Sequence, residues 1–144
     1  MLTKIKTATL AGVAGSVVSV ETDIRRGLPV FMVVGLADTT IKEASRRIRP
    51  AIMNSGYDFP NERVTVNLAP AGKPKEGSHF DLPIAVGIIV SGIMPSGTDM
   101  NDTAFLGELS LDGRVNRING ALPLAMSLRA AGVKNIVVPR KNAE

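Results

Sequence analysis

The chain has 144 residues, of which 44% are apolar and 21% charged, and its net charge is +4. This length suits one domain, and the apolar share is enough for a packed core, so the composition excludes a disordered segment. The absence of Cys excludes disulfides and thiolate metal sites, and a single His leaves little for any other metal site. The chain has one Tyr and no Trp, which argues against an aromatic platform on which nucleic-acid bases stack.

The first residues imitate a secretory signal, because Lys4 and Lys6 precede an apolar run. Gly12 and Gly15 interrupt that run, and the alternation of apolar and polar residues that follows is typical of a half-buried strand. No apolar run is long enough to cross a bilayer. We therefore expect a cytoplasmic protein with no membrane partner.

Strands and one helix are predicted for the first part of the chain. The three strands cover residues 3–11, 16–25 and 29–35. The helix starts at Asp38, a good N-cap residue, and its apolar residues recur at spacings of three and four until Gly56. Pro50 should bend this helix or end it early, and Glu43 is placed to pair with Arg47.

The second part of the chain alternates between strands and helices. A strand covers residues 63–68, and a helix that starts at Asp81 is too apolar to face water. A hairpin turns at residues 112–113, a third helix ends at Gly132, and a last strand follows. This order predicts one domain, residues 1–144, with a two-layer α/β sandwich fold, a mixed β-sheet and about three helices.

The stretch PKEGSHFDLP, residues 74–83, combines a Ser, a His and an Asp between two apolar segments. Ser78, His79 and Asp81 have the chemistry of a catalytic triad, but near neighbours in one short loop rarely point toward one another. The other interpretation, which we favour, is that Asp81 caps the following helix.

Two lysines and two carboxylates near this stretch have both a functional and a plain interpretation. Lys73 and Lys75 can hold an anion near the N-terminus of the second helix, or they can be solvated loop residues, which we favour. Glu108 and Asp112 flank the predicted hairpin turn, where carboxylates mostly serve solubility and turn formation.

Several blocks together resemble a known family. PKEGSHFDLPIAVGI and LGELSLDGRVNRINGALPLAMSLRAAGVKNIVVPRKN resemble the proteolytic domain of Lon proteases, and more closely the ChlI-type N-terminal domain of magnesium chelatase-like AAA+ ATPases of the ComM (YifB) family. GLPVFMVVGLADTTIKEASRRIRPAIMNSGYDFP and VTVNLAPAGKPKEGSHFDLPIAVGI extend the resemblance over essentially the whole chain. It implies the fold of the second domain of ribosomal protein S5, in which crossovers can be left-handed.

The resemblance also implies that the peptidase site is degenerate. Lon peptidases use a Ser nucleophile and a Lys amine that accepts its proton. Alignment with them places His79 at the nucleophile position and Leu122 at the position of the base. An imidazole and an isobutyl group cannot replace that pair, so we expect no catalytic residue in this domain.

The function that follows from the resemblance is that of a non-catalytic accessory domain. Its expected partners are its own downstream AAA+ domain and neighbouring subunits of a hexamer, since the chain stops where the family domain ends. ATP and Mg²⁺ are expected as cofactors of the parent protein and none for this domain. The family further implies DNA remodelling, namely branch migration during natural transformation. The alternative is a free-standing serine peptidase or other hydrolase that uses Ser78.

A basic stripe on the first predicted helix is a candidate DNA contact. Lys42, Arg46 and Arg49 recur at spacings of four and three and so share one side of the helix. Together with Lys73 and Lys75 they predict weak, sequence-independent binding through phosphate contacts. The alternative is an ordinary solvated face or a subunit contact.

Overall fold

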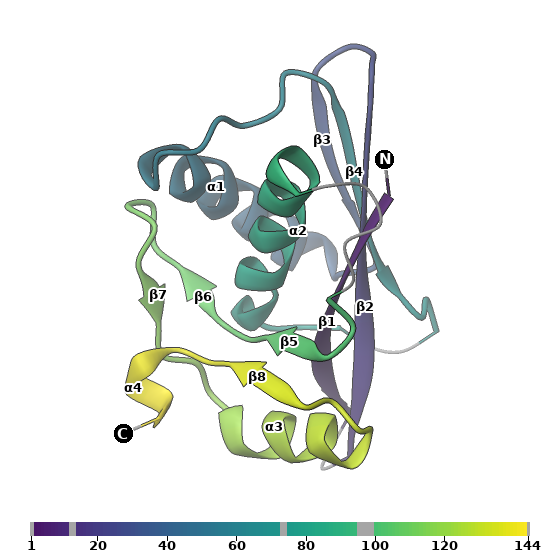
Figure 1. Cartoon of the computed structure of the whole chain (residues 1–144), viewed down its shortest axis with the longest axis vertical. Helices are drawn as coiled ribbons and strands as arrows, with labels where there is room; N and C mark the ends of the chain where they lie inside the picture. The colour runs from purple at the N-terminus through teal and green to yellow at the C-terminus, as the bar shows by residue number, and fades with distance from the viewer. Residues whose placement is uncertain (1, 12–13, 73–74, 95–99, 144) are drawn as a thin grey trace.

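The computed structural model describes residues 2–11, 14–72, 75–94 and 100–143, and its main feature is a mixed sheet (Figure 1). The strands of this sheet, in spatial order, are β3 (Val30–Val34), β4 (Arg63–Ala69), β2 (Ala14–Arg25), β1 (Leu2–Ala11), β5 (Thr103–Phe105) and β8 (Asn135–Val137). β2 pairs antiparallel with β1 and β4, while the pairs β3–β4, β1–β5 and β5–β8 are parallel. The predicted α/β sandwich with a mixed sheet is therefore confirmed.

Helices and a small hairpin complete the described part of the chain. They are α1 (Asp38–Asn54), the 3₁₀ turn η1 (Ser78–Phe80), α2 (Asp81–Ile93), β6 (Glu108–Leu109), β7 (Val115–Asn116), α3 (Ala121–Ala130) and α4 (Arg140–Ala143). The sequence predicted the first three α-helices but not η1 or α4, which are too short to show a helical period.

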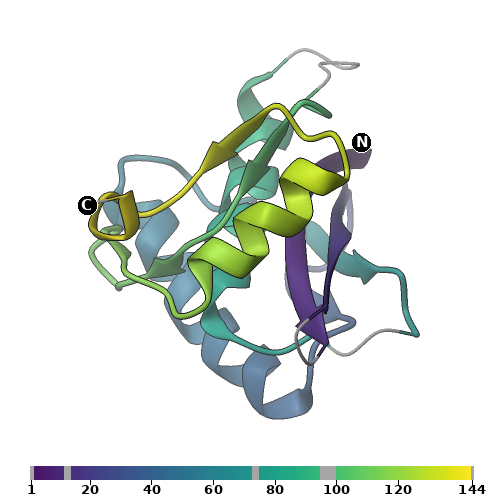
Figure 2. The same cartoon turned by 90° about the horizontal axis from the view of Figure 1, so that it is seen from below.

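The two faces of the sheet bury separate cores. Because successive side chains of a strand point to opposite faces, Ile5 and Ala8 of β1 lie on opposite sides of the sheet. Ile5 packs in the core that α1 and α2 cover, together with Val20 of β2. Ala8 packs in a smaller core with Leu124 and Leu128 of α3. Figures 1 and 2 show α2 and α3 on opposite sides of β5 and β8.

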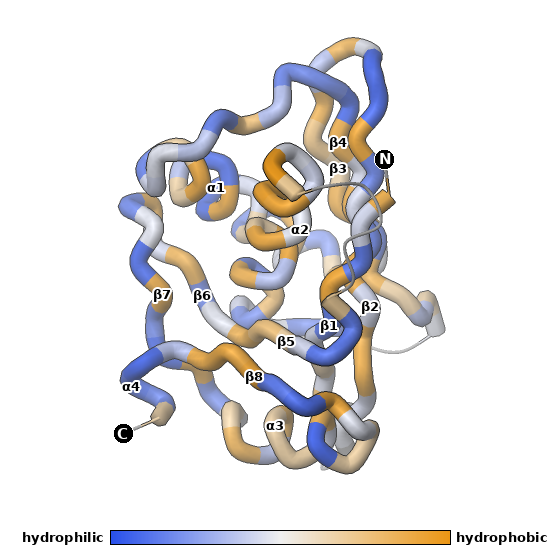
Figure 3. The backbone as a smooth tube through the Cα atoms, in the orientation of Figure 1, coloured by the Kyte–Doolittle hydropathy of each residue, from blue (hydrophilic) through white to orange (hydrophobic). Residues whose placement is uncertain are grey.

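α2 is the central helix of the larger core, as its composition predicts. Its residues Ile84 and Ile88 are at most 2% exposed, and the helix contacts both β1 and β2. In Figure 3, which colours each residue by its hydropathy, α2 is mostly in the hydrophobic colour and lies between α1 and the sheet. Within the residues described, no helix combines the length and the apolar character needed to cross a membrane.

Some predicted element boundaries are wrong, and burial explains one of them. Asp38 is not the N-cap of α1, since Ala37 holds that position and no side chain caps it. Pro50 does not end α1 early, because the next residues, Ala51 and Ile52, are at most 2% exposed and their burial holds the last turn in place. The predicted hairpin is also shorter, because its first part forms β5 in the main sheet.

Candidate functional site

His79, at the position that the Lon alignment gives to the nucleophile, is a buried residue of η1. It is 8% exposed, and its Nε2 lies 2.8 Å from the carbonyl oxygen of Ala8 in β1. A carbonyl only accepts hydrogen bonds, so Nε2 carries the proton in this contact. The ring also lies 4.1 Å from the ring of Phe80. Burial lowers the pKa of His79, although the hydrogen bond with Ala8 acts in the other direction. The lowered pKa favours a neutral imidazole at pH 7.

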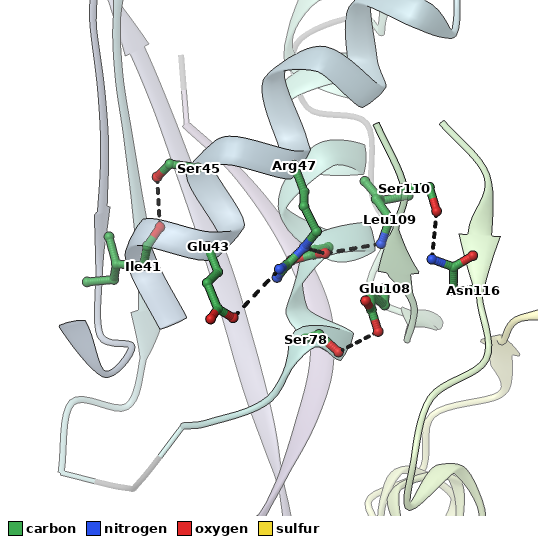
Figure 4. A network of polar contacts seen from close by, with 10 residues as sticks. Ile41, Glu43, Ser45, Arg47, Ser78, Glu108, Leu109, Ser110 and Asn116 are labelled. Atoms are coloured by element: carbon green, nitrogen blue, oxygen red, sulfur yellow. Dashed lines mark hydrogen bonds and ion pairs between the residues drawn. The ribbon is translucent and has the colours of Figure 1, made fainter. Parts of the chain in front are cut away.

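Ser78, the neighbouring residue, has a carboxylate as its partner. Its Oγ donates a hydrogen bond of 2.9 Å to Oε2 of Glu108 in β6 (Figure 4). The sequence interpretation gave Glu108 a role in the turn and missed this contact, because thirty residues separate the two side chains. The turn role does hold for Asp112, whose Oδ1 accepts a hydrogen bond from the backbone amide of Arg114.

Asp81 is not a helix cap, which corrects the interpretation that we favoured. Its carboxylate accepts two hydrogen bonds from Arg47 of α1, with Nε at 2.6 Å and Nη2 at 3.0 Å. The amide of Leu109 in β6 is a further donor, at 3.1 Å. Asp81 therefore joins α1, α2 and the β6–β7 hairpin, and the structure shows no side-chain cap at the start of α2. Figure 4 shows the side chain of Arg47 extending from α1 toward Leu109 of β6.

The Arg47–Asp81 pair has two opposing electrostatic effects. Burial raises the pKa of the Asp81 carboxyl, although the hydrogen bonds from Arg47 and Leu109 act in the other direction. The hydrogen bond with Asp81 is also the main reason that the pKa of Arg47 is raised. Glu43, the predicted partner of Arg47, is only a secondary one, with a carboxylate oxygen 3.7 Å from Nη1.

The three triad-type residues thus have three different partners. Ser78 contacts Glu108, His79 contacts Ala8, and Asp81 contacts Arg47. In the described structure, the short stretch does not bring these side chains together as a hydrogen-bonded triad. Leu122, at the position of the Lon base, lies in the first turn of α3 and is 72% exposed.

Lys75 is buried, so the structure contradicts the solvated loop residue that we favoured. Its side chain donates a hydrogen bond to the carbonyl oxygen of Pro70, and the residue is 3% exposed. Burial lowers the pKa of the amine. A lysine held in this way is poorly placed to contact a DNA phosphate. Lys73, its predicted companion, lies outside the described residues.

The basic stripe of α1 is exposed as predicted. Lys42, Arg46 and Arg49 all face solvent. The guanidinium of Arg49 lies 5.1 Å from the centre of the Phe59 ring, a cation–π distance that leaves the charge at the surface.

The described residues form no metal centre, and the cavity between α1, α2 and the β6–β7 hairpin is mostly apolar. In residues 2–11, 14–72, 75–94 and 100–143, no three His, Asp or Glu side chains gather as metal ligands. A cavity of about 130 Å³ lies between α1, α2 and the β6–β7 hairpin, and apolar side chains such as Ile52, Leu82 and Val86 dominate its lining. This lining offers no titratable acid or base except the phenol of Tyr57.

Comparison with known proteins gives one family and several longer relatives. Residues 20–142 match the family described as subunit ChlI of Mg-chelatase. The chain is 41% identical over 139 residues to the uncharacterized protein YifB of Salmonella typhimurium, which covers 96% of this chain and 27% of that protein. It is 37% identical over 132 residues to competence protein ComM of Haemophilus influenzae, and this match covers 92% of this chain and 26% of ComM.

A more distant similarity connects the chain to peptidases. It is 26% identical over 135 residues to the Lon protease of Citrifermentans bemidjiense, covering 89% of this chain and 17% of that protein. The chain thus spans about a quarter of the length of YifB and ComM and a smaller share of the Lon protease.

Proposed function

Since the chain belongs to the family of the Mg-chelatase subunit ChlI, and is related to ComM and YifB, we propose that it is a non-catalytic accessory domain of a longer AAA+ ATPase. The family assignment agrees with the resemblance found in the sequence blocks. The parent protein, on this proposal, binds ATP with Mg²⁺ in a downstream module, and this domain contacts that module and neighbouring subunits. A full-length gene product without Mg²⁺-dependent ATP hydrolysis would contradict it.

One observation carries the non-catalytic part of the proposal. The position that aligns with the Lon nucleophile holds His79, whose Nε2 is engaged with a backbone carbonyl inside the core. The position of the general base holds Leu122, which has no proton acceptor. Serine peptidase chemistry needs an oxygen nucleophile beside a base, and neither of these two side chains supplies one of those groups.

The test is cleavage of a labelled unfolded protein by the purified chain, with and without ATP and Mg²⁺. We expect no turnover above background, and no gain from His79→Ser alone, because the base is still missing. The matched variants are Ser78→Ala and Ser110→Ala, since both serines donate or accept side-chain hydrogen bonds near the hairpin. Cleavage that Ser78→Ala abolishes and Ser110→Ala leaves intact would overturn the proposal.

That outcome would support the second candidate function, a hydrolase that uses Ser78. The observation in its favour is the 2.9 Å hydrogen bond from Ser78 to Glu108, because a carboxylate can accept a proton from a hydroxyl. Against it stands the position of Ser78 beside a buried, neutral imidazole that faces Ala8 instead.

We further propose that the parent protein remodels DNA, as branch migration in transformation requires, and that this domain adds a weak contact. The proposal is supported by the name of one relative, competence protein ComM, which assigns that relative to competence. The exposed stripe Lys42, Arg46 and Arg49 is the candidate contact, whereas Lys75 is not because it is buried. Each phosphate contact adds roughly 0.9 to the slope of log affinity against log salt, so three contacts leave little binding at physiological salt.

Titration with a fluorescent single strand at about 50 and 200 mM salt tests the stripe, because electrostatic binding falls steeply between these conditions. Changing Lys42, Arg46 and Arg49 together to Glu should abolish the binding seen at low salt. A control variant with Arg114, Arg117 and Lys141 changed to Glu has the same net charge and leaves α1 unchanged. Equal losses in the two variants would show a response to net charge alone and would remove the specific role of α1.

A further inference from the structure

Helix α3 presents an apolar ridge to solvent on the side away from its core. Leu124 and Leu128 bury its inner face at 1% and 0% exposure, while Leu122 and Met126 are 72% and 62% exposed. Residues four apart lie above one another on a helix, so Leu122 and Met126 form a continuous ridge. Figure 2 shows α3 at the surface beside β8.

A groove separates this ridge from the edge of the sheet. Its volume is about 410 Å³, and we call it the α3–β8 groove. Its lining residues are Leu122, Ala125, Met126, Arg129, Val133, Lys134 and Ile136. The lining is apolar along the floor and basic at Arg129 and Lys134, and it includes no carboxylate.

The segment of the chain that carries α3 and β8 is strongly basic. Residues 113–143 contain six Lys and Arg residues and no Asp or Glu. Because the whole chain carries +4, the remaining residues together carry −2 (4 − 6). Arg129 and Lys134 are exposed, and among the described residues neither forms an ion pair. The groove is therefore an apolar surface whose border carries two cations that form no ion pair with any described residue, Arg129 and Lys134.

From this arrangement we propose that the α3–β8 groove binds an acidic amphipathic helix of a partner protein. The apolar ridge calls for leucine-like side chains at spacings of three and four, which is the pattern of a helix that lies in a groove. The positive border calls for Asp or Glu beside those side chains, since complementary charge guides encounter and orientation. The proposal goes beyond the accessory role above and is independent of the ATPase assignment.

Other occupants fit less well. A second copy in a two-fold contact would bring a second set of Arg129 and Lys134 to the same interface, and neither groove lining has a carboxylate to match them, so the charges would repel. A nucleic acid would satisfy the border, but the groove lining contains no aromatic side chain on which bases stack. A flat anionic membrane would leave the concave floor between α3 and β8 unfilled.

The experiment uses the chain with a labelled synthetic helical peptide that has leucines at positions i, i+4 and i+7 and flanking glutamates. A scrambled peptide of the same composition is the reference, and fluorescence anisotropy is the measurement. We expect the amphipathic peptide to bind at least tenfold more tightly than the scrambled one. Met126→Glu should remove that difference, whereas Met53→Glu, which changes an exposed methionine of α1, should preserve it.

Charge reversal separates the border from the ridge. The double variant Arg129→Glu and Lys134→Glu should lose the acidic peptide and bind a version with lysines in place of the glutamates. Circular dichroism confirms that each variant is folded. Binding that Met126→Glu leaves unchanged, or that charge reversal does not transfer to the lysine peptide, overturns the proposal. The proposal is also overturned if the peptide does not bind while single-stranded DNA or anionic lipid vesicles do, and Met126→Glu abolishes that binding.

Discussion

Arg47 and Asp81 form an ion pair whose carboxylate side chain is 1% exposed and whose guanidinium side chain is 20% exposed. A pair of this kind adds little net stability, because the cost of removing both charges from water offsets much of their attraction. Loss of one partner is far more serious, since it leaves a buried charge without compensation. Asp81 also accepts the Leu109 amide, so this charge fixes the hairpin against both large helices.

Arg47→Met should therefore lower the free energy of unfolding by about 3–5 kcal/mol at pH 7. Burial already raises the pKa of Asp81, and without the guanidinium that pKa rises further. Between the unfolded and the folded pKa, the folded chain binds a proton that the unfolded chain does not. The free energy of unfolding consequently falls as the pH rises through this range, and the defect should shrink toward pH 5.

Urea denaturation at about pH 5 and pH 7 measures this effect, because both conditions lie above the ordinary pKa of an unfolded aspartate. The matched variant is Asp81→Asn, which has no titrating carboxyl at the site and should show a defect that changes little between the two conditions. If the loss of unfolding free energy in Arg47→Met is as independent of pH as that in Asp81→Asn, then Asp81 is not the charge that Arg47→Met leaves without a partner.

At the scale of elements, the contact between α2 and β2 depends on a glycine. A Cβ atom at Gly87 would lie 2.7 Å from Oγ1 of Thr22, a hydroxyl that is buried and without a hydrogen-bond partner among the described residues. Gly92 of the same helix has no atom within 4 Å of the corresponding position. The two glycines therefore separate close packing from helix propensity.

Gly87→Ala should destabilise the fold by about 1–3 kcal/mol, because overpacking outweighs the gain of about 1 kcal/mol that alanine brings to a helix. Gly92→Ala should keep that gain and stabilise. In the Gly87→Ala background, Thr22→Ala removes the obstructing hydroxyl, so the double variant should be more stable than the sum of the single effects. Chemical denaturation of the wild type, the two single variants and the double variant gives the coupling between positions 22 and 87. If the effects of Gly87→Ala and Thr22→Ala on the free energy of unfolding are additive, α2 has shifted to accept the extra methyl group.

The elements also show what the sequence can and cannot predict. The helices α1 and α2 were predicted because their apolar residues follow the helical period, which is a local signal. The ion pair of Asp81 with Arg47 was not predicted, because the two residues lie thirty-four positions apart and Glu43 was a plausible local partner for Arg47. Lys75 was missed for a related reason, since nothing in a polar loop sequence indicates that one lysine is buried against a backbone carbonyl.

At the scale of the whole molecule, one sheet separates two cores, and the smaller core depends on close contact between α3 and β2. A Cβ atom at Gly15 would lie 1.7 Å from Oγ of Ser127, so only glycine permits this approach. The contact positions α3 with its apolar ridge outward. The family blocks predict one domain with degenerate peptidase positions, and both stay predictions. The placement of this ridge could not be predicted from them, because it depends on packing between segments more than a hundred residues apart in the chain.

We expect the chain alone to be a monomer or a weak oligomer, because on the proposal above the contacts that hold a ring together belong to the ATPase module. Its exposed apolar ridge on α3, formed by Leu122 and Met126, has a border of cations that repels a second copy. Light scattering at micromolar concentration should give the monomer mass at low salt. Higher salt screens the positive border. If self-association increases at higher salt, it should depend on the apolar ridge and should be absent in the Met126→Glu variant. A stable hexamer at low salt would contradict this prediction and would show that the domain drives assembly by itself.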